Sequence, residues 1–277
     1  MHPIVNHLVQ LQELALVRAE QKVSGKEADL AQLDASIGSL TVQLADDIRL
    51  TVGKLQKRDP MFIVPVLGSV CAGCGMHLPT SLVQIVRQGN VVCSCPTCTR
   101  ILFYPEAPLR NEQRPASRVG PRKIGIQRFS DVALMMPNLE AVERDEAIRE
   151  MAVKLQETGY VDMADRLTED AIRRETIVST AVEHGIAFPH VRCVEGGGLT
   201  MAVGMSRKGV KFGSPRKLTR LIFFMVIPTA ASAFYLKLLA GLTTTFITEE
   251  AREKLMVETT PEAMWKTLCK LTRPTIA

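Results

Sequence analysis

The sequence lacks a long uninterrupted apolar run and an export signal. The N-terminal segment MHPIVNHLVQLQEL does not show the basic segment, apolar core and cleavage site that a signal peptide needs. The most apolar stretch, 221–242, contains Pro228 and Lys237, and a charged residue is costly inside a membrane. We therefore expect a cytoplasmic protein without a membrane span, in which this stretch forms a buried strand, a turn and an amphipathic helix.

The chain also lacks a strong charge of either sign. Its formal net charge is +5 over 277 residues, and 46% of the residues are hydrophobic and 23% charged, which is ordinary for a soluble globular protein. A charge this small is no argument for nucleic-acid binding. The length suggests about two domains.

Residues 105–125 have few apolar residues and no periodic pattern. This segment contains four Pro, five basic and two acidic residues, and no aromatic residue that would stack on a nucleic-acid base. Such a composition favours an extended, solvated linker. We therefore interpret the basic residues as part of a linker and leave contact with a phosphate backbone as the less favoured alternative.

Cysteine is rare outside one segment, because five of the seven cysteines lie between positions 71 and 98. Cys71 and Cys74 form one CxxC pair, and Cys95 and Cys98 form a second. In a chain without an export signal, such pairs indicate metal ligands rather than disulfides. Two tight turns can aim four thiolates at one ion and leave no open coordination position, so we predict a structural Zn²⁺ site in a zinc ribbon.

Two other residues near these pairs are weaker ligand candidates. Cys93 can replace one ligand, but it lies in an apolar pattern that predicts a strand. His77 is expected at the surface. Between the two pairs, the sequence predicts a short helix that begins near Thr80 and ends at Gly89.

Residues 3–58 contain little Gly or Pro and predict helix. One face carries apolar residues three and four apart, namely Leu30, Leu33, Ile37, Leu40 and Leu44. After Leu44 the spacing changes to four and four, which is a stutter. We expect either a hairpin of two helices, Pro3–Val23 and Lys26–Lys57, or one long kinked helix. The apolar seam would pack within the chain or join two chains in a homodimer.

From Ile126 onwards, helical and strand patterns alternate. A helix over 145–158 is expected to end at Gly159, and Asp162 is expected to cap a helix that reaches about Thr176. Strands are predicted for LTMAVGMS, more weakly for GVKF, and for LIFFMVI, and two further helices are expected to begin after Thr248 and Thr260. This interleaving predicts an α/β domain with a mixed central sheet.

The segment GIAFPH, residues 185–190, carries the candidate for chemistry. Ile186 to Phe188 predict a buried strand, and Pro189 cannot donate to a ladder, so we expect the strand to end there. His190 would then lie at a strand end beside a loop, where reactive side chains are often displayed. An imidazole can serve as a base or as a nucleophile near neutral pH.

The longer string RETIVSTAVEHGIAFPHVR, Arg174 to Arg192, resembles the phosphorylation-site signature of enzyme IIA domains of the fructose/mannitol type. These domains belong to the bacterial phosphoenolpyruvate-dependent sugar phosphotransferase system and include its nitrogen-regulatory branch. The resemblance implies that His190 accepts a phosphoryl group from HPr or a related phosphocarrier. It also implies that Arg174 lies in the site, that Thr180 donates a hydroxyl hydrogen bond, and that Arg192 supplies charge at the rim.

Two positions differ from that family. Where members often carry a second histidine, this chain has Tyr235, and the usual acidic stretch after GVKF is replaced by residues 213–216. These differences favour a regulatory phosphorylation switch over a sugar-uptake component. A third possibility is a non-enzymatic adaptor or nucleic-acid-binding protein with a degenerate IIA domain. The sequence leaves open whether the chain is an enzyme, here a transferase that carries phosphohistidine.

Residues 64–104 resemble the bacterial coiled-coil and C4 zinc-ribbon family, in which CxxCG, an apolar helix, CPxC and RILY follow one another. Here Thr99 stands where that family usually has Gly. The resemblance implies an unknown protein or nucleic-acid partner. Together the patterns predict four parts: helices at 1–60, a C4 zinc ribbon at 61–104, a basic linker at 105–125, and an enzyme IIA-like α/β domain at 126–277.

Overall fold

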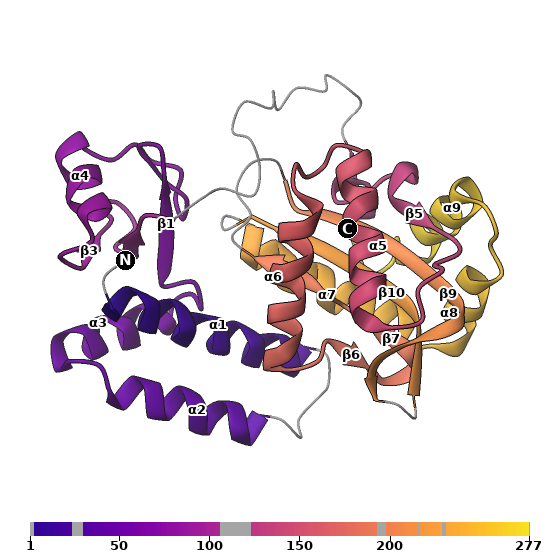
Figure 1. Ribbon diagram of the computed structural model, residues 1–277, viewed down its shortest axis with the longest axis horizontal. Coiled ribbons are helices and arrows are strands. Elements are labelled where there is room, and N and C mark those ends of the chain that lie inside the picture. The colour runs from indigo at the N-terminus through magenta and orange to yellow at the C-terminus, as the bar shows by residue number, and fades with distance from the viewer. Residues whose placement is uncertain are drawn as a thin grey trace. The chain divides into compact units, whose positions relative to one another are not determined.

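The computed structural model describes residues 3–23, 30–105, 123–192, 198–214, 217–228 and 231–276. The chain divides into two compact units, residues 1–108 and 109–277, and each has its own strands and helices (Figure 1). The finer division into four parts remains a prediction. Every helix among the described residues is too short or too polar to traverse a lipid bilayer.

The N-terminal unit begins with three helices, α1 (Pro3–Val23), α2 (Leu30–Val42) and α3 (Asp46–Gln56). The expected single helix over 26–57 is wrong, because the helix breaks between Val42 and Asp46. The break adjoins Leu44, where the apolar spacing changes, and residues 24–29 lie outside the described residues. The break allows both flanking helices to turn apolar residues toward the same core.

The apolar seam of α2 and α3 packs against α1 within the same chain. One buried cluster joins residues of α1 and α3, the segment between α2 and α3, and the segments that follow, namely Val5, Leu8, Leu11, Leu44, Val52, Leu55, Phe62, Ile63 and Ile101. Ile37 and Leu40 of α2 pack against this cluster. His7 Nε2 lies 2.8 Å from the Leu40 carbonyl, and Arg18 pairs with Asp34. The hairpin of α1 and α2 is therefore packed on itself, while a homodimer remains a prediction.

The remainder of this unit is the ribbon. Its elements are β1 (Ile63–Leu67), β2 (Val70–Cys71), α4 (Thr80–Gln88), β3 (Cys93–Ser94) and β4 (Ile101–Phe103). The sheet order is β2-β1-β4-β3, with β1 and β4 parallel. Gly89 ends α4 with a left-handed φ of 68°, as its sequence position predicts. Cys93 lies in β3, as expected.

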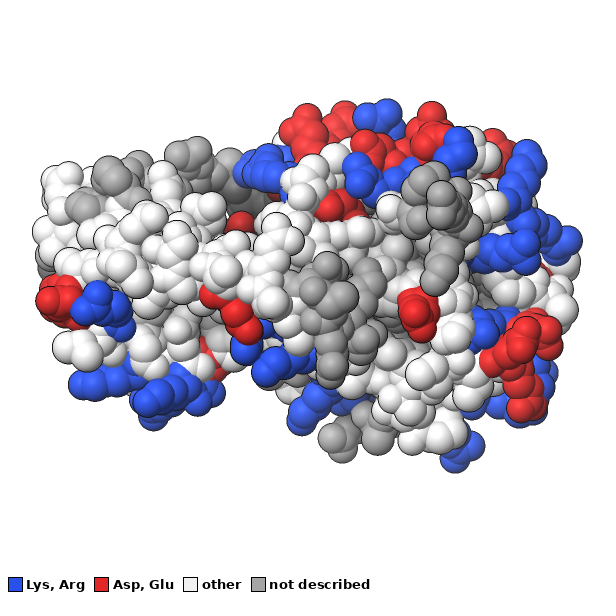
Figure 2. Space-filling view, turned by 90° about the horizontal axis from the view of Figure 1, so that it is seen from below, with Lys and Arg blue, Asp and Glu red and all other residues white. Residues whose placement is uncertain are grey.

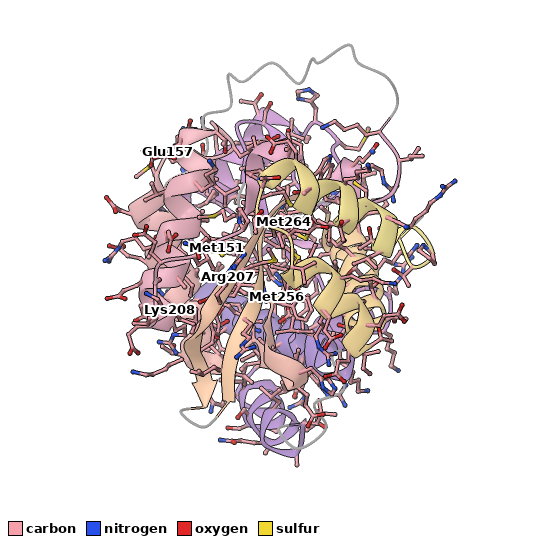
Figure 3. All side chains as sticks on the ribbon, turned by 90° about the vertical axis from the view of Figure 1, so that its right-hand side faces the viewer. Met151, Glu157, Arg207, Lys208, Met256 and Met264 are labelled. Carbon is pink, nitrogen blue, oxygen red and sulfur yellow. The ribbon has the colours of Figure 1, made fainter. Side chains whose placement is uncertain are left out.

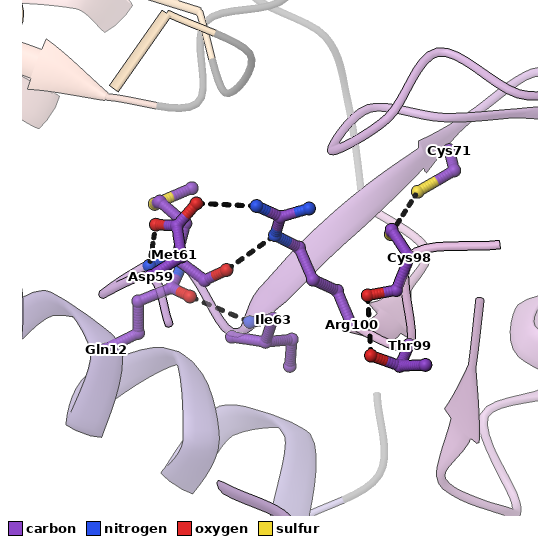
Figure 4. Close-up of polar contacts among 8 residues, drawn as sticks. All are labelled: Gln12, Asp59, Met61, Ile63, Cys71, Cys98, Thr99 and Arg100. Carbon is purple, nitrogen blue, oxygen red and sulfur yellow. Dashed lines mark hydrogen bonds and ion pairs between the residues drawn. The ribbon is translucent and has the colours of Figure 1, made fainter. Parts of the chain in front are cut away.

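A buried hydrogen bond joins the helices to the ribbon (Figure 4). Gln12 of α1 is 4% exposed, and its Oε1 accepts a hydrogen bond of 2.8 Å from the backbone N–H of Ile63 in β1. A buried N–H without an acceptor is costly, so this amide satisfies the first residue of β1. The three helices and the ribbon thus share one core.

The C-terminal unit consists of one sheet with helices on both faces. Its helices are α5 (Arg144–Glu157), α6 (Ala164–Ile177), α7 (Ser232–Phe246), α8 (Glu249–Met256) and α9 (Pro261–Thr272). Its strands are β5 (Met135–Met136), β6 (Ala181–Val182), β7 (Ile186–Ala187), β8 (His190–Arg192), β9 (Thr200–Ser214) and β10 (Lys217–Ile227). Short 3-10 helices lie at Gly125–Arg128, Val132–Leu134 and Glu183–Gly185.

The sheet is mixed, as the sequence predicts. The order is β5-β9-β10-β7-β6, and β8 also pairs with β10. β9 and β10 are antiparallel, whereas β7 and β8 run parallel to β10. α5 and α6 cover one face and α8 and α9 the other, with α7 packed on α8 and α9 (Figures 1 and 3).

The core forms around β10, whose residues from Leu221 to Ile227 are all buried. The Phe223 ring stacks on Phe188 at 5.4 Å and contacts Phe246 of α7 at 5.2 Å between centroids. Met151 of α5 and Met264 of α9, both fully buried, come from the two helical layers (Figure 3). The run 221–242 is therefore a central strand followed by a helix, as its composition predicts.

Two details of this unit differ from expectation. LTMAVGMS and GVKF belong to the single strand β9, because both pair with β10 across a register shift. α6 begins at Ala164 with Met163 rather than Asp162 at its N-cap, and Gln156 Oε1 accepts from the Ala164 N–H at 2.6 Å. A side chain of the preceding helix has taken the role that a local cap usually has.

Candidate functional site

His190 opens strand β8 and pairs with Met225 of β10. The strand predicted for Ile186–Phe188 ends before Pro189, as expected, with β7 ending at Ala187, and a separate strand, β8, begins directly after the proline. Proline lacks an N–H but keeps its carbonyl, and the Pro189 carbonyl accepts from the Met225 N–H at 2.9 Å. β7 and β8 therefore pair with β10 on either side of Pro189.

The His190 ring is buried, with 1% of its surface exposed. This corrects the expectation of a side chain displayed beside a loop: β8 pairs with the central strand β10, and α7 covers the ring. Its Nδ1 lies 3.0 Å from the carbonyl oxygen of Phe188. A carbonyl only accepts, so this contact requires a hydrogen on Nδ1 and leaves the lone pair on Nε2.

Tyr235 of α7 contacts this ring, and Arg192 of β8 contacts Tyr235. The Tyr235 hydroxyl lies 3.3 Å from His190 Nδ1, and the two ring centroids are 5.1 Å apart. The guanidinium carbon of Arg192 lies 4.7 Å from the centre of the Tyr235 ring, a cation–π contact. Tyr235 is 1% exposed, so the position where the resemblance expects a second histidine is in contact with His190.

Arg174 and Thr180 lie at and after the end of α6, which packs against β8. Arg174 Nη1 donates to the Val178 carbonyl at 2.9 Å, in the loop that leads to Thr180. The Thr180 hydroxyl donates to Glu175, whose second oxygen accepts from the Thr180 N–H at 3.0 Å. Glu175, which is 3% exposed, therefore fixes the position of Thr180 through two hydrogen bonds. This role of Glu175 is not apparent from the sequence, although the residue lies in the RE pair of the signature.

The four predicted ligands of the ribbon meet in space. The sulfur atoms of Cys71, Cys74, Cys95 and Cys98 lie within 4.8 Å of one another. Each pair forms a tight turn, in which the Gly75 N–H donates to the Cys71 carbonyl at 2.8 Å and the Thr99 N–H to the Cys95 carbonyl at 2.9 Å. The set contains neither His nor a carboxylate, so it fits a closed tetrahedral zinc site.

The ionisation of these thiols depends on burial and on backbone donors. Burial raises the pKa of Cys71, and it also raises the pKa of Cys74. At Cys95, burial acts in the same direction, but the backbone N–H groups of Cys98 and Thr97 outweigh it and lower the pKa to about 7. Turn N–H groups that stabilise a thiolate are what a metal ligand requires.

The residues beside the cluster are placed as the sequence suggests. Cys93 Sγ contacts the Val91 carbonyl, and His77 is exposed and bonds Ser69. Arg100 donates to the Met61 carbonyl at 2.8 Å and pairs with Asp59, which ties the second CxxC turn to the start of β1 (Figure 4).

The chain belongs to the family described as phosphoenolpyruvate-dependent sugar phosphotransferase system, EIIA 2, whose model matches residues 129–270. A second model, the C4-type zinc ribbon domain, matches residues 70–102. Both resemblances drawn from the sequence are thereby confirmed.

Among curated relatives, the chain is similar to the PTS system fructose-specific EIIA component of Haloferax volcanii. The identity is 28% over 134 residues, which are 46% of this chain and 87% of that protein. It is also 28% identical over 128 residues to the PTS system fructose-specific EIIABC component of Bacillus subtilis. That match spans 46% of this chain and only 20% of the relative.

Among solved structures, the nitrogen regulatory protein IIA-Ntr from Neisseria meningitidis is 25% identical with a TM-score of 0.46. The alignment covers 50% of this chain and 96% of that one.

Proposed function

We propose that residues 126–277 accept a phosphoryl group on His190 from an HPr-like phosphocarrier protein and act in regulation. The observation that supports this most directly is the contact between His190 Nδ1 and the Phe188 carbonyl, at 3.0 Å. It leaves Nε2 as the nitrogen with a lone pair, which an acceptor of a phosphoryl group needs. Membership of the EIIA 2 family supports the same chemistry.

Phosphoryl transfer of this kind depends on positioning and on neutralising charge. A phosphoryl group adds about two negative charges, which cationic and N–H donors must offset. Arg174 and Thr180 are the proposed donors, and Thr180 would have to exchange its bond to Glu175 for one to phosphate. Because His190 is 1% exposed, the surrounding chain must open before a carrier protein can reach it.

The contact between Tyr235 and His190 supports regulation rather than sugar uptake. Tyrosine can donate one hydrogen bond but, unlike an imidazole, cannot carry a positive charge at neutral pH, so Tyr235 does not replace a second histidine in the site. A sugar-uptake component remains the alternative within the same family, with a cysteine or histidine of a partner as the next acceptor.

A second candidate is an adaptor in which the IIA domain no longer transfers phosphate, and the burial of His190 is the observation that favours it. Incubation with phosphoenolpyruvate, enzyme I and HPr discriminates between the two. Labelling of the wild type that is lost in His190→Ala supports the acceptor. A wild type that stays unlabelled, although a known EIIA protein labels beside it, contradicts the acceptor and supports the adaptor.

For the N-terminal unit, we propose that Zn²⁺ bound by Cys71, Cys74, Cys95 and Cys98 is structural and that the ribbon binds a partner. The ribbon exposes the apolar side chains Met76, Ile85 and Val91, which favours a protein surface. On the face drawn in Figure 2, small groups of both charge signs alternate with uncharged areas. A salt-dependent shift of DNA or RNA by the protein would instead indicate a nucleic-acid partner. Cysteines that bind a metal rather than form disulfides fit a reducing compartment, so a cytoplasmic location is part of this proposal.

A further inference from the structure

Arg192 lies on the same side of β8 as His190. Side chains alternate along a strand, so residues two apart share a face and lie about 7 Å from each other. Val191, between them, faces the other way. Tyr235 of α7 contacts both residues, with its hydroxyl 3.3 Å from His190 Nδ1 and its ring 4.7 Å from the Arg192 guanidinium carbon. One buried aromatic ring therefore connects the candidate acceptor to a cation.

The charged side chains near this face make different kinds of contact. Arg174 of α6 donates to the Val178 carbonyl, and Glu175 of α6 accepts both hydrogen bonds from Thr180. Arg192 contacts the aromatic ring of Tyr235, with its guanidinium carbon 4.7 Å from the ring centre. Its strand also carries His190, so the cation and the imidazole are fixed relative to each other.

We propose that Arg192, held on the ring of Tyr235, is the cation that neutralises a phosphoryl group on His190. Tyr235 is then a positioning residue, and its ring rather than its hydroxyl is the essential part. Tyr235 stands at the position where the resemblance expects a second histidine. A guanidinium keeps its charge at every physiological pH, whereas an imidazole titrates near neutrality. This inference rests on the proposed function, because it concerns the same acceptor.

The transfer step balances without a proton transfer inside the site. The bond from phosphorus to the imidazole nitrogen of the donor breaks as the bond from phosphorus to His190 Nε2 forms. The electron pair of the broken bond returns to the nitrogen of the donor. The hydrogen on Nδ1 stays in its contact with the Phe188 carbonyl, and the Arg192 guanidinium faces the phosphoryl oxygens.

The test compares variants that separate charge, ring and hydroxyl. His190 is phosphorylated by HPr in one arm and by the small donor phosphoramidate in the other, and the rate of labelling and the half-life of the phosphohistidine are measured. Arg192→Gln should slow labelling and shorten the half-life by about tenfold or more, the scale of one lost charge-assisted bond. Arg192→Lys should recover part of the loss. Arg207→Gln, which removes an exposed cation of β9, is the control and should match the wild type.

Tyr235→Phe keeps the ring and should stay within about threefold of the wild type, whereas Tyr235→Leu should resemble Arg192→Gln. Thermal unfolding of each variant shows whether a reduced labelling rate comes from misfolding. If Tyr235→Leu does not fold, Arg192→Gln, at a partly exposed position, still tests the inference. Wild-type rates and half-lives in Arg192→Gln would overturn the inference, as would equal losses in Tyr235→Phe and Tyr235→Leu. If HPr fails to label the wild type, the proposed function is contradicted. The phosphoramidate arm then still measures whether Arg192 stabilises phosphohistidine at position 190.

Discussion

At the scale of single residues, Thr99 has a backbone conformation that its side chain disfavours. Its φ is 62°, in the left-handed region, where a β-branched residue is rare. The residue ends the second CxxC turn, and its N–H donates to the Cys95 carbonyl. The related zinc-ribbon family usually has Gly here, and the strain explains why Gly suits the position.

Thr99→Gly is expected to stabilise the N-terminal unit by about 1 kcal/mol, because glycine reaches a positive φ without steric strain. The hydrogen bond from the Thr99 hydroxyl to the Cys98 carbonyl is lost and reduces the gain. Denaturant unfolding of the zinc-loaded protein measures the change. Gly75 of the first CxxC turn has a φ of 75°, and a Cβ added there would meet no atom within 4 Å. Gly75→Ala should therefore lower the stability through backbone strain alone. A loss of stability in Thr99→Gly would contradict the strain.

Asp170 of α6 should make the stability of the C-terminal unit dependent on pH. Burial raises its pKa, and the nearby Arg173 and Arg166 lower it less. A carboxyl with a raised pKa binds its proton more tightly in the folded state. The free energy of unfolding therefore falls as the pH rises through the range in which Asp170 ionises.

Asp170→Asn is expected to raise the free energy of unfolding at pH 7 and to flatten its dependence on pH in the acidic range. The ion pair with Arg173 is lost as well, but Arg173 is 75% exposed and such pairs contribute little. Urea unfolding between pH 4 and pH 7, followed by Trp265 fluorescence, gives both quantities. Asp165→Asn, an exposed carboxylate on the same helix, is the control. An unchanged pH profile in Asp170→Asn would contradict the raised pKa.

At the scale of elements, contacts distant in sequence decide where the segments end. Proline predicts a strand end, and β7 does end at Ala187, but the Met225 N–H of β10 donates to the Pro189 carbonyl and a new strand, β8, begins at His190. The apolar period predicts one helix through Leu44, yet the helix breaks there to pack on α1. The N-terminus of α9 is capped by the residue that precedes it, because the Thr260 hydroxyl accepts from the Ala263 N–H. The N-terminus of α6 is capped by a residue distant from it, because a side chain of α5 supplies the acceptor.

The junction between α1 and β1 gives an element-scale prediction. Gln12→Leu removes the acceptor of the buried Ile63 N–H and should destabilise the N-terminal unit by about 1–3 kcal/mol, the penalty for an unsatisfied buried donor. Gln10→Leu makes the same chemical change on the exposed face of α1 and should have little effect. Denaturant unfolding followed by circular dichroism measures both. Equal effects of the two substitutions would show that the hydrogen bond does not join helix and ribbon.

At the scale of the whole molecule, two compact units have separate cores, and this predicts two separable responses to metal removal. The protein contains one Trp, Trp265 in α9, so its fluorescence reports on the C-terminal unit alone. A zinc chelator should lower the unfolding temperature of the N-terminal unit, because a ribbon of this size depends on its metal. The reactivity of the five cysteines between positions 71 and 98, separated from that of Cys193 and Cys269 by peptide mapping, follows that unit during heating.

The transition seen by Trp265 should not move when the chelator is added. Replacement of Cys95 by Ser should reproduce the chelator effect and make the protein insensitive to further chelator. A common shift of both transitions would show that the units fold cooperatively, and an unchanged thiol transition would argue against a structural metal.

Sequence alone determined the features that depend on short spacings: the two CxxC pairs, the alternation of helix and strand after Ile126, and the signature around His190. Such patterns are set by the turns and periods of a single segment. Only the tertiary structure decided that His190 is buried, that Glu175 accepts two hydrogen bonds from Thr180, and that Tyr235 contacts both Arg192 and His190. The last of these joins residues 45 positions apart in the chain, and their approach depends on how α7 packs on the sheet. Packing between distant segments arises from the summed burial of many side chains, which no local pattern records.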